Sequence, residues 1–85
     1  MTSHRVAELI ALERLRLGLS QAELALRAGL TQPDLSKVER GDRKLSAEEF
    51  LALLRALRFT DNPTLQRRIY ALLEVGVVDG SSGEE

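Results

Sequence analysis

Residues that start or stop helices occur at short intervals along this chain. They constrain its fold more than any other feature of the sequence. Two capping boxes, Ser20–Glu23 and Ser46–Glu49, let a serine hydroxyl accept from a backbone amide while the glutamate reaches back to the serine. Pro33 and Pro63 suit the first turn of a helix, where a missing N–H is harmless. Helices are therefore predicted over about residues 5–17, 20–28, 31–41, 46–57 and 63–75.

Apolar residues recur at helical spacing within these segments. The clearest set lies in the fourth segment, at Phe50, Leu53, Leu54 and Leu57. No stretch alternates apolar and polar residues as a half-buried strand does. The predicted fold class is all-α, a compact five-helix bundle.

The 85 residues are expected to form one domain, spanning residues 1–76 and including the last predicted helix. Residues 77–85, rich in glycine, serine and acidic side chains, are predicted to be a disordered tail. The apolar runs are far shorter than the roughly 20 residues that span a bilayer, and the N-terminus lacks a signal pattern. We therefore expect a cytoplasmic protein with no membrane partner.

Cysteine and histidine usage excludes several kinds of site. The chain has no cysteine and one histidine, His4, so neither a disulfide framework nor a cysteine–histidine metal site is expected. It has no P-loop and no HExxH motif, and the remaining carboxylates are scattered. The sequence thus predicts no cofactor, no metal and no enzyme activity.

The charge is nearly balanced overall but unevenly distributed. The formal net charge is −1. Residues 1–60 carry ten Lys/Arg against eight Asp/Glu, a balance of +2, whereas residues 61–85 carry two against five, a balance of −3. Any basic surface must therefore be local, and non-specific attraction to a polyanion is expected to be weak.

The stretch from Leu19 to Gly41 contains two short predicted helices joined by Ala28–Leu30, a turn with a central glycine. This arrangement matches a helix-turn-helix unit. If Leu35, Val38 and Glu39 face inward, steps of 100° per residue place an exposed face on the opposite side of the second helix. That face comprises Pro33, Ser36, Lys37 and Arg40, with Gln32 at the tip. Such side chains suit a DNA groove, although an ordinary solvated helix face has a similar composition.

A joint set of positions in this unit resembles the phage repressor and Cro (XRE-type) family of helix-turn-helix regulators. The set comprises Gln21, Glu23, Leu24, Ala25, Ala28, Gly29, Leu30, Leu35, Val38 and Glu39–Gly41. The resemblance covers Ile10 to about Leu57. It implies binding to double-stranded DNA through the helix that follows the turn.

The resemblance also implies roles for individual residues. Gln21 would bond a phosphate, Gln32 would touch bases, and the positions around them would contact base edges or the backbone. The full predicted DNA-contacting set is Gln21, Thr31, Gln32, Asp34, Ser36, Lys37, Arg40, Arg43 and Lys44. Two of the residues here depart from the family pattern. Pro33 can only contact a thymine methyl, and Asp34 would repel phosphate unless it accepts from cytosine or caps its own helix.

Two further features have structural interpretations. Arg14 and Glu39 match positions that form an ion pair between the first and third helices in the family, so they are predicted to be structural. His4 and Arg5 lie where some relatives carry a groove-wrapping arm, but two cationic candidates are few, and a frayed terminus is favoured.

The last predicted helix resembles the dimer-forming helix of the lambda-type repressor domain. A homodimer would use an interface of Leu65, Ile69, Tyr70, Leu72 and Leu73. The alternative is that these apolar residues close the core of the single chain. Dimerisation is favoured because one helix-turn-helix unit makes few base contacts and relatives pair across half-sites about 34 Å apart.

Two functions remain open from the sequence. The favoured one is a sequence-specific transcriptional regulator, a repressor that binds a pseudo-palindromic operator as a homodimer. The other is a DNA-binding antitoxin or interaction module that binds a partner protein through its last helix or through the tail from Val75 onward.

Overall fold

The computed structural model of this chain describes residues 4–81, with side chains described as far as residue 73, and confirms the all-α prediction. Every regular element in that part of the chain is a helix. The elements are α1 (His4–Arg16), α2 (Gln21–Ala28), α3 (Gln32–Glu39), α4 (Ala47–Ala56), the 3-10 turn η1 (Phe59–Asp61) and α5 (Pro63–Ser81). None of these helices is long and apolar enough to cross a membrane.

Side-chain caps explain where the short helices begin. Ser20 Oγ accepts from the Glu23 amide at 3.0 Å, and Glu23 Oε1 accepts from the Ser20 amide at 2.8 Å. The same reciprocal pair joins Ser46 and Glu49, at 3.1 and 3.0 Å. Thr31 Oγ1 caps α3 by accepting from the Asp34 amide at 3.1 Å. Each cap satisfies amides that the first helical turn leaves unpaired and contributes about 1 kcal/mol.

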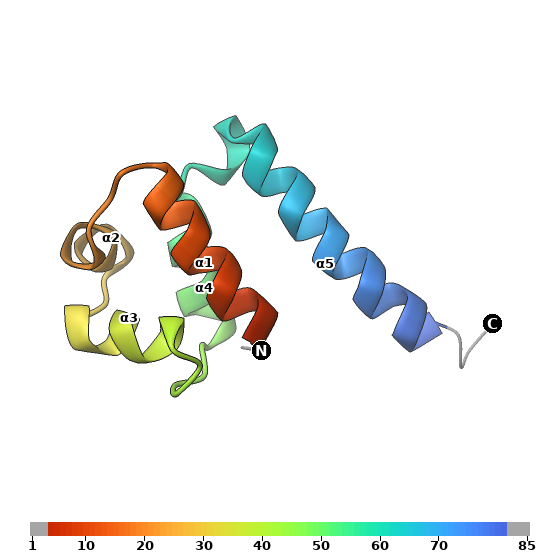
Figure 1. Cartoon of the computed structure of the whole chain (residues 1–85), viewed down its shortest axis with the longest axis horizontal. Helices are drawn as coiled ribbons and strands as arrows, with labels where there is room; N and C mark the ends of the chain where they lie inside the picture. The colour runs from red at the N-terminus through yellow and green to blue at the C-terminus, as the bar shows by residue number, and fades with distance from the viewer. Residues whose placement is uncertain (1–3, 82–85) are drawn as a thin grey trace.

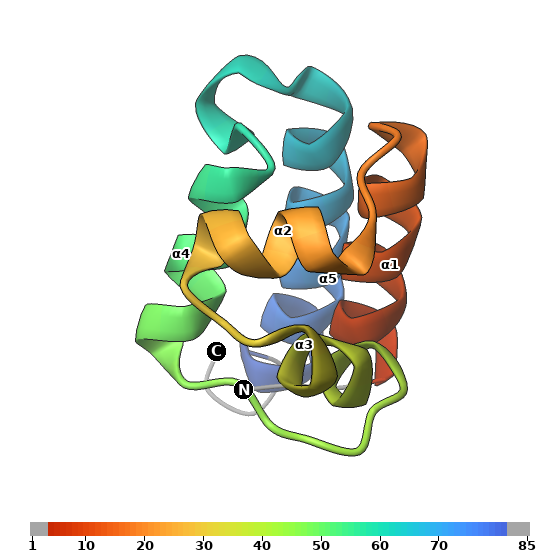
Figure 2. The same cartoon turned by 90° about the vertical axis from the view of Figure 1, so that its left-hand side faces the viewer.

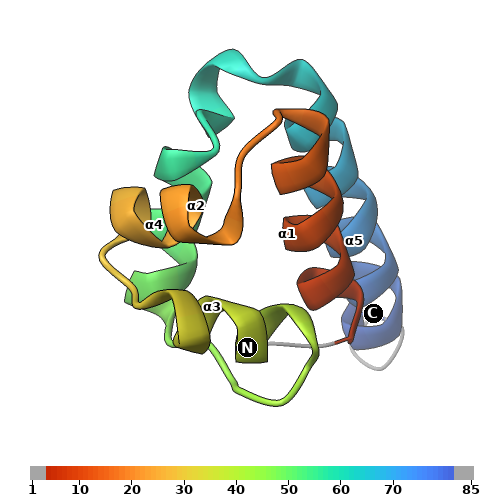
Figure 3. The same cartoon turned by 60° about the vertical axis from the view of Figure 1, so that its left-hand side comes forward.

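The helices form three successive groups (Figure 1). Helices α2 and α3 lie at one side, α1 and α4 in the middle, and α5 at the other side. Turning the molecule brings α2 and α3 to the front with α5 behind them (Figure 2), and the intermediate view keeps α1 between α3 and α5 (Figure 3). The helix-turn-helix unit, formed by α2 and α3, and helix α5 therefore lie on opposite sides of the molecule.

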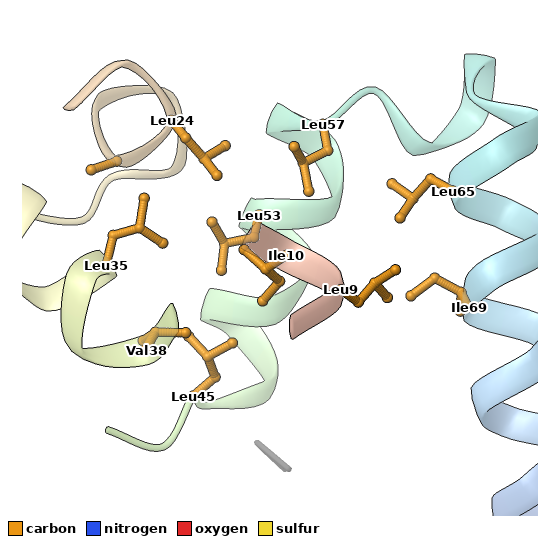
Figure 4. Close-up of a cluster of buried hydrophobic side chains, with 11 residues drawn as sticks. Leu9, Ile10, Leu24, Leu35, Val38, Leu45, Leu53, Leu57, Leu65 and Ile69 are labelled. Atoms are coloured by element: carbon orange, nitrogen blue, oxygen red, sulfur yellow. The ribbon is translucent and has the colours of Figure 1, made fainter. Parts of the chain in front are cut away.

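One apolar core joins all five helices (Figure 4). Its centre consists of fully buried side chains, one or two from each of the first four helices: Ile10, Leu24, Leu35, Val38 and Leu53. Burying a side chain of this size stabilises the fold by roughly 1.5–3 kcal/mol. Because α3 supplies Leu35 and Val38, its orientation is set by the same core.

Helix α5 closes this core, so two residues of the predicted dimer interface are buried within the single chain. Leu65 is fully buried and Ile69 is 8 % exposed, and both pack into the core beside Leu9 (Figure 4). These two residues are therefore core residues, not surface residues that a partner could reach. Tyr70 and Leu73 are each 55 % exposed. Leu72 is half-buried and packs against the core.

Helix α5 also extends further than predicted, to Ser81 instead of ending before Gly76. A glycine inside a helix costs only about 1 kcal/mol relative to alanine, and no proline follows to stop the helix. The predicted tail therefore overlaps the helix at residues 77–81. Its last residues, 82–85, lie outside the described part of the chain.

A buried polar cluster holds α5 against α1. Asn62 Oδ1 caps α5 by accepting from the Leu65 amide at 3.1 Å, and Asn62 Nδ2 donates to Glu13 Oε2 at 2.7 Å. Arg16 donates to Glu13 and to Asn62 Oδ1. Burial raises the pKa of the Glu13 carboxyl, but the hydrogen bonds from Arg16 and Asn62 outweigh it and leave the pKa below its usual value. The sequence did not predict the link between Asn62 and Glu13, which lie 49 residues apart.

Candidate nucleic-acid interface

The turn between α2 and α3 depends on Gly29. Its backbone is left-handed, with φ 74° and ψ 24°, and the Leu30 amide then donates to the Ala25 carbonyl at 2.8 Å. Space is available for a Cβ at Gly29, so the cost of another residue comes from the positive φ, roughly 1 kcal/mol or more. Leu30 packs against the core directly after this turn, two residues before α3 begins.

The outer side of α3 carries all but one of the side chains that the helical-wheel argument placed there, the exception being Ser36. Gln32, Pro33, Lys37 and Arg40 are exposed, while Leu35 and Val38 are fully buried on the other side. Asp34 and Ser36 are half-buried between the two sides. Helix α3 thus presents one polar, partly cationic surface away from the core, on the side of the molecule opposite α5 (Figures 1 and 2).

The ion pair expected between Arg14 and Glu39 is present. Arg14 Nε donates to Glu39 Oε2 at 2.7 Å and Arg14 Nη2 donates to Glu39 Oε1 at 3.0 Å. The two side chains are only 12 % and 7 % exposed. Arg14 Nη1 also donates to the Leu19 carbonyl at 2.9 Å, so the pair joins α1, α3 and the start of the helix-turn-helix unit.

A chain of hydrogen bonds extends from this ion pair to the exposed tip of α3. Gln21 Nε2 donates to Glu39 Oε1 at 3.0 Å, and Gln32 Nε2 donates to Gln21 Oε1 at 2.8 Å. The predicted phosphate contact and the predicted base contact are therefore bonded to each other. Sequence reasoning missed this link because Gln21 and Gln32 lie 11 residues apart on different helices.

Arg43 is held by carboxylates of its own chain. Its guanidinium donates to both oxygens of Glu49, at 3.1 and 2.9 Å, and lies 3.9 Å from Asp34 Oδ1. The hydrogen bond from Arg43, and then the one from the Ser46 amide, lower the pKa of the Glu49 carboxyl to about 2. Arg43 therefore ties the loop after α3 to the N-terminus of α4. Its role at Glu49 was not predicted, because the partner lies across a loop.

The other cations of this surface differ in how strongly they interact with neighbouring groups of the same chain. Arg40 donates to Ser36 Oγ at 2.7 Å and pairs with Asp42 at 3.2 Å, but Arg40 and Asp42 are both exposed, so that pair is weak. The Lys37 and Lys44 side chains are exposed and have no ion-pair partner within the described residues. These two lysines are the cations most available to a polyanion.

The remaining expectations from the sequence concern an N-terminal arm and a metal site. His4 and Arg5 belong to the first turn of α1, so within the described residues they form no separate arm. Residues 1–3 lie outside the described part of the chain. No group of three or more His, Cys, Asp or Glu side chains that could hold a metal ion occurs among the described residues.

Two short helices joined by a glycine turn, with the second helix presenting an exposed polar face, define a helix-turn-helix protein. A family model described as helix-turn-helix matches residues 10–61, which is more than half of the chain. The chain belongs to the helix-turn-helix family, of the phage repressor and Cro (XRE) type. It is a DNA-binding transcription regulator, and the family is one of regulators rather than enzymes.

Solved structures of one protein, the restriction-modification controller protein C.Esp1396I, resemble this structure along most of its length. Two point mutants share 26 % identity with this chain, with TM-scores of 0.69 and 0.70, covering 82 % and 86 % of this chain and 91 % and 96 % of theirs. The wild type shares 25 % identity with a TM-score of 0.64, covering 78 % of this chain and 91 % of its own. The search of curated proteins found no match.

Proposed function

We propose that this chain is a sequence-specific regulator that binds a pseudo-palindromic operator in double-stranded DNA as a homodimer and acts as a repressor. The observation that carries the proposal is the exposed polar side of α3. Leu35 and Val38 anchor the helix in the core, so its outer side chains project from a rigid support. A helix held in this way fits the major groove of DNA, which is about 12 Å wide.

The proposed contacts divide into base readers and backbone contacts. Gln32, Ser36 and Lys37 are the proposed readers of base edges, because amide, hydroxyl and ammonium groups recognise bases in the major groove. Gln21, Thr31, Arg40 and Lys44 are the proposed contacts to flanking phosphates. Arg43 joins them only if it exchanges Glu49 for a phosphate, and Asp34 serves as a partner of Arg43 next to the capped turn.

The homodimer is proposed to form through the outer side of α5. Tyr70 and Leu73 are exposed there, and Leu72 lines a groove of about 460 Å³ between α1 and α5. The other lining residues are Arg5, Glu8, Leu9, Leu12, Arg68 and Ala71. Exposed apolar side chains beside a groove mark a protein interface, and a domain of this size gains stability from a second copy.

A narrower role is supported by the structural likeness to a restriction-modification controller protein. Under this proposal the operator lies upstream of genes of a restriction-modification system, among which we include the regulator's own gene. A reporter gene placed behind the chain's own upstream region tests this role. Expression that falls as the protein is supplied supports repression, and unchanged expression contradicts it.

Selection of bound duplexes from a random library tests sequence-specific binding. We expect an enriched inverted repeat whose half-sites are about one helical turn apart, because each protomer places one α3 in the groove. Recovery of unenriched sequence would contradict the proposal. Co-purification of a second, stably bound protein would instead favour the antitoxin or interaction-module alternative.

A further inference from the structure

We propose that a groove between α4 and η1 binds the acidic segment Glu84–Glu85 of a second copy of this chain, with Arg55 and Arg58 as the cations that hold it. The two α5 helices would then lie antiparallel. The inference rests on the proposed homodimer through the outer side of α5, and it adds the occupant of the groove and the direction in which the helices pair.

The groove combines apolar side chains with cations that have no partner. Its volume is about 240 Å³. Arg55 and Arg58 are exposed, and neither forms an ion pair within the described residues. Asp61, the acidic residue of η1, is also exposed and does not line the groove. Such a site suits an acidic segment of a protein. The lining residues are Leu51, Leu54, Arg55, Arg58, Phe59 and Thr60.

The groove is continuous with the outer side of α5. Gln66 Nε2 donates to the carbonyls of Phe59 and Thr60, at 2.7 and 3.3 Å, so this side of α5 lies against two residues that line the groove. Tyr70 and Leu73 follow Gln66 by four and seven residues, which places them on the same side of the helix. A partner helix that covers Tyr70 and Leu73 is therefore directed toward the groove.

The charge of this part of the chain changes sign along its length. Residues 55–68 carry four arginines and one acidic residue. Residues 69–85 carry four acidic residues and no lysine or arginine. Parallel copies of α5 would bring like charges together, whereas antiparallel copies bring the acidic end of each beside the basic start of the other. A two-fold axis makes the same contact twice.

The length of α5 excludes the groove of the same chain. Helix α5 has 19 residues, which extend about 28 Å away from η1 at its start (Figure 1). Residues 82–85 can span at most about 14 Å, so they reach only half of the way back. In an antiparallel pair that crosses at residue 72, the midpoint of α5, the end of each helix comes beside the start of the other. Residues 84 and 85 then continue toward the η1 of the partner.

Reversal of charge on either side tests the contact. The groove variant carries Arg55→Glu with Arg58→Glu, and the segment variant carries Glu84→Arg with Glu85→Arg. Each brings like charges together at two symmetric sites, so the Kd of the homodimer should rise at least about tenfold, as measured by sedimentation equilibrium without DNA. Combining all four substitutions in one chain should return the Kd to within about threefold of the wild type.

Mixing the two variants tests whether the contact joins two copies. The groove variant has acidic residues at both places, and the segment variant has arginines at both places. A heterodimer of the two therefore pairs opposite charges at both contacts, whereas each variant alone pairs like charges. We expect equal amounts of the two to form heterodimers with a Kd near that of the wild type, as measured by native mass spectrometry.

Two controls separate this contact from effects of net charge or folding. Arg27→Glu reverses an exposed cation of α2 that does not line the groove, and it should leave the Kd within about twofold of the wild type. Circular dichroism of each variant at the same concentration confirms that association is measured on folded protein.

The outcomes distinguish this inference from the proposed homodimer. A wild type that stays monomeric at every concentration contradicts the homodimer itself. A dimeric wild type whose Kd is unchanged by either double reversal overturns only the inference. So does an effect of the groove variant without one of the segment variant, because the groove then holds another part of the second copy. Failure of the fourfold variant and of the mixture to restore the dimer overturns the inference as well.

Discussion

Helices α3 and α5 are similar on the side that faces the core and different on the side that faces solvent. Each places two apolar side chains in the same core, Leu35 and Val38 from α3 and Leu65 and Ile69 from α5 (Figure 4). Outside, α3 presents Gln32, Lys37 and Arg40, whereas α5 presents Tyr70 and Leu73. One side of the molecule thus offers groups that suit a nucleic acid, and the opposite side offers groups that suit another protein.

The comparison indicates how one small core can serve two surfaces. Because both helices are anchored in it, changes to inner side chains should affect stability, and changes to outer side chains should affect binding alone. The predictions below use this separation. They run from the largest expected effect to the smallest.

The inner side of α5 should be as important for stability as any core position. Leu65→Ala removes a fully buried side chain and should lower the free energy of unfolding by about 2–5 kcal/mol. Arg67→Ala, at an exposed position of the same helix outside the proposed interface, is the control and should change it by less than about 0.5 kcal/mol. Urea titration followed by circular dichroism measures both, and similar losses for the two variants would contradict the division of α5 into two sides.

The Arg14–Glu39 pair should be a major stabilising contact of the helix-turn-helix unit. Arg14→Ala leaves a nearly buried carboxylate without its partner and should cost about 3 kcal/mol in unfolding free energy. The Arg43–Glu49 pair is more exposed, at 30 % and 27 %, so Arg43→Ala should cost much less. Finding the reverse order in the same urea titration would rule out this ranking of the two pairs.

The outer side of α5 should control assembly without controlling folding. Leu73→Asp places a charge on the exposed apolar surface and should give a folded monomer, as measured by analytical ultracentrifugation. Operator binding should then fall at least about tenfold, which corresponds to 1.4 kcal/mol, because the half-sites are no longer bound together. A variant that remains dimeric with unchanged affinity would place the interface elsewhere.

The two cations near the end of α3 should contribute differently to DNA binding. Lys44→Ala removes an unpaired cation and should weaken binding to all sequences while reducing the logarithmic salt slope by about 1. Arg43→Ala should reduce the slope less, because Glu49 and Asp34 already compensate its charge. Equal changes in slope would mean that Arg43 leaves Glu49 when DNA binds.

The smallest expected effect is a pH dependence at the N-terminus of α4. The pKa of Glu49 is lowered to about 2, below the value of about 4.3 for an unfolded glutamate. The contribution of the ionised Glu49 carboxylate to folding stability is therefore complete above about pH 5 and is lost as the pH falls toward 2. The Tm difference between wild type and Glu49→Gln should shrink over this range, and a difference independent of pH would contradict the assignment.

Local signals in the sequence were enough to predict the helices and most of their starts. The capping hydroxyls of Ser20, Thr31 and Ser46 act within three residues of themselves, so their partners can be found from spacing alone. The outer side of α3 also followed from helical geometry once Leu35 and Val38 were taken as inward. The Arg14–Glu39 pair came from family resemblance, because its members are 25 residues apart.

Contacts between segments that are distant along the chain could not be predicted from the sequence. The Glu13–Asn62 bond spans 49 residues, and nothing in either segment marks the other. The direction of α5 was ambiguous because it carries apolar residues on both sides, so Leu65 and Ile69 were assigned to an interface although they belong to the core. Its end was misjudged because Gly76 suggested a stop that the helix passes through.

The most direct test of the account compares binding of the wild type to its selected operator and to random duplex at the same salt concentration. If the outer side of α3 reads base edges, the operator should be favoured by roughly 4 kcal/mol or more, and both affinities should fall steeply as salt increases. Equal affinity for the two duplexes would contradict sequence-specific recognition by α3.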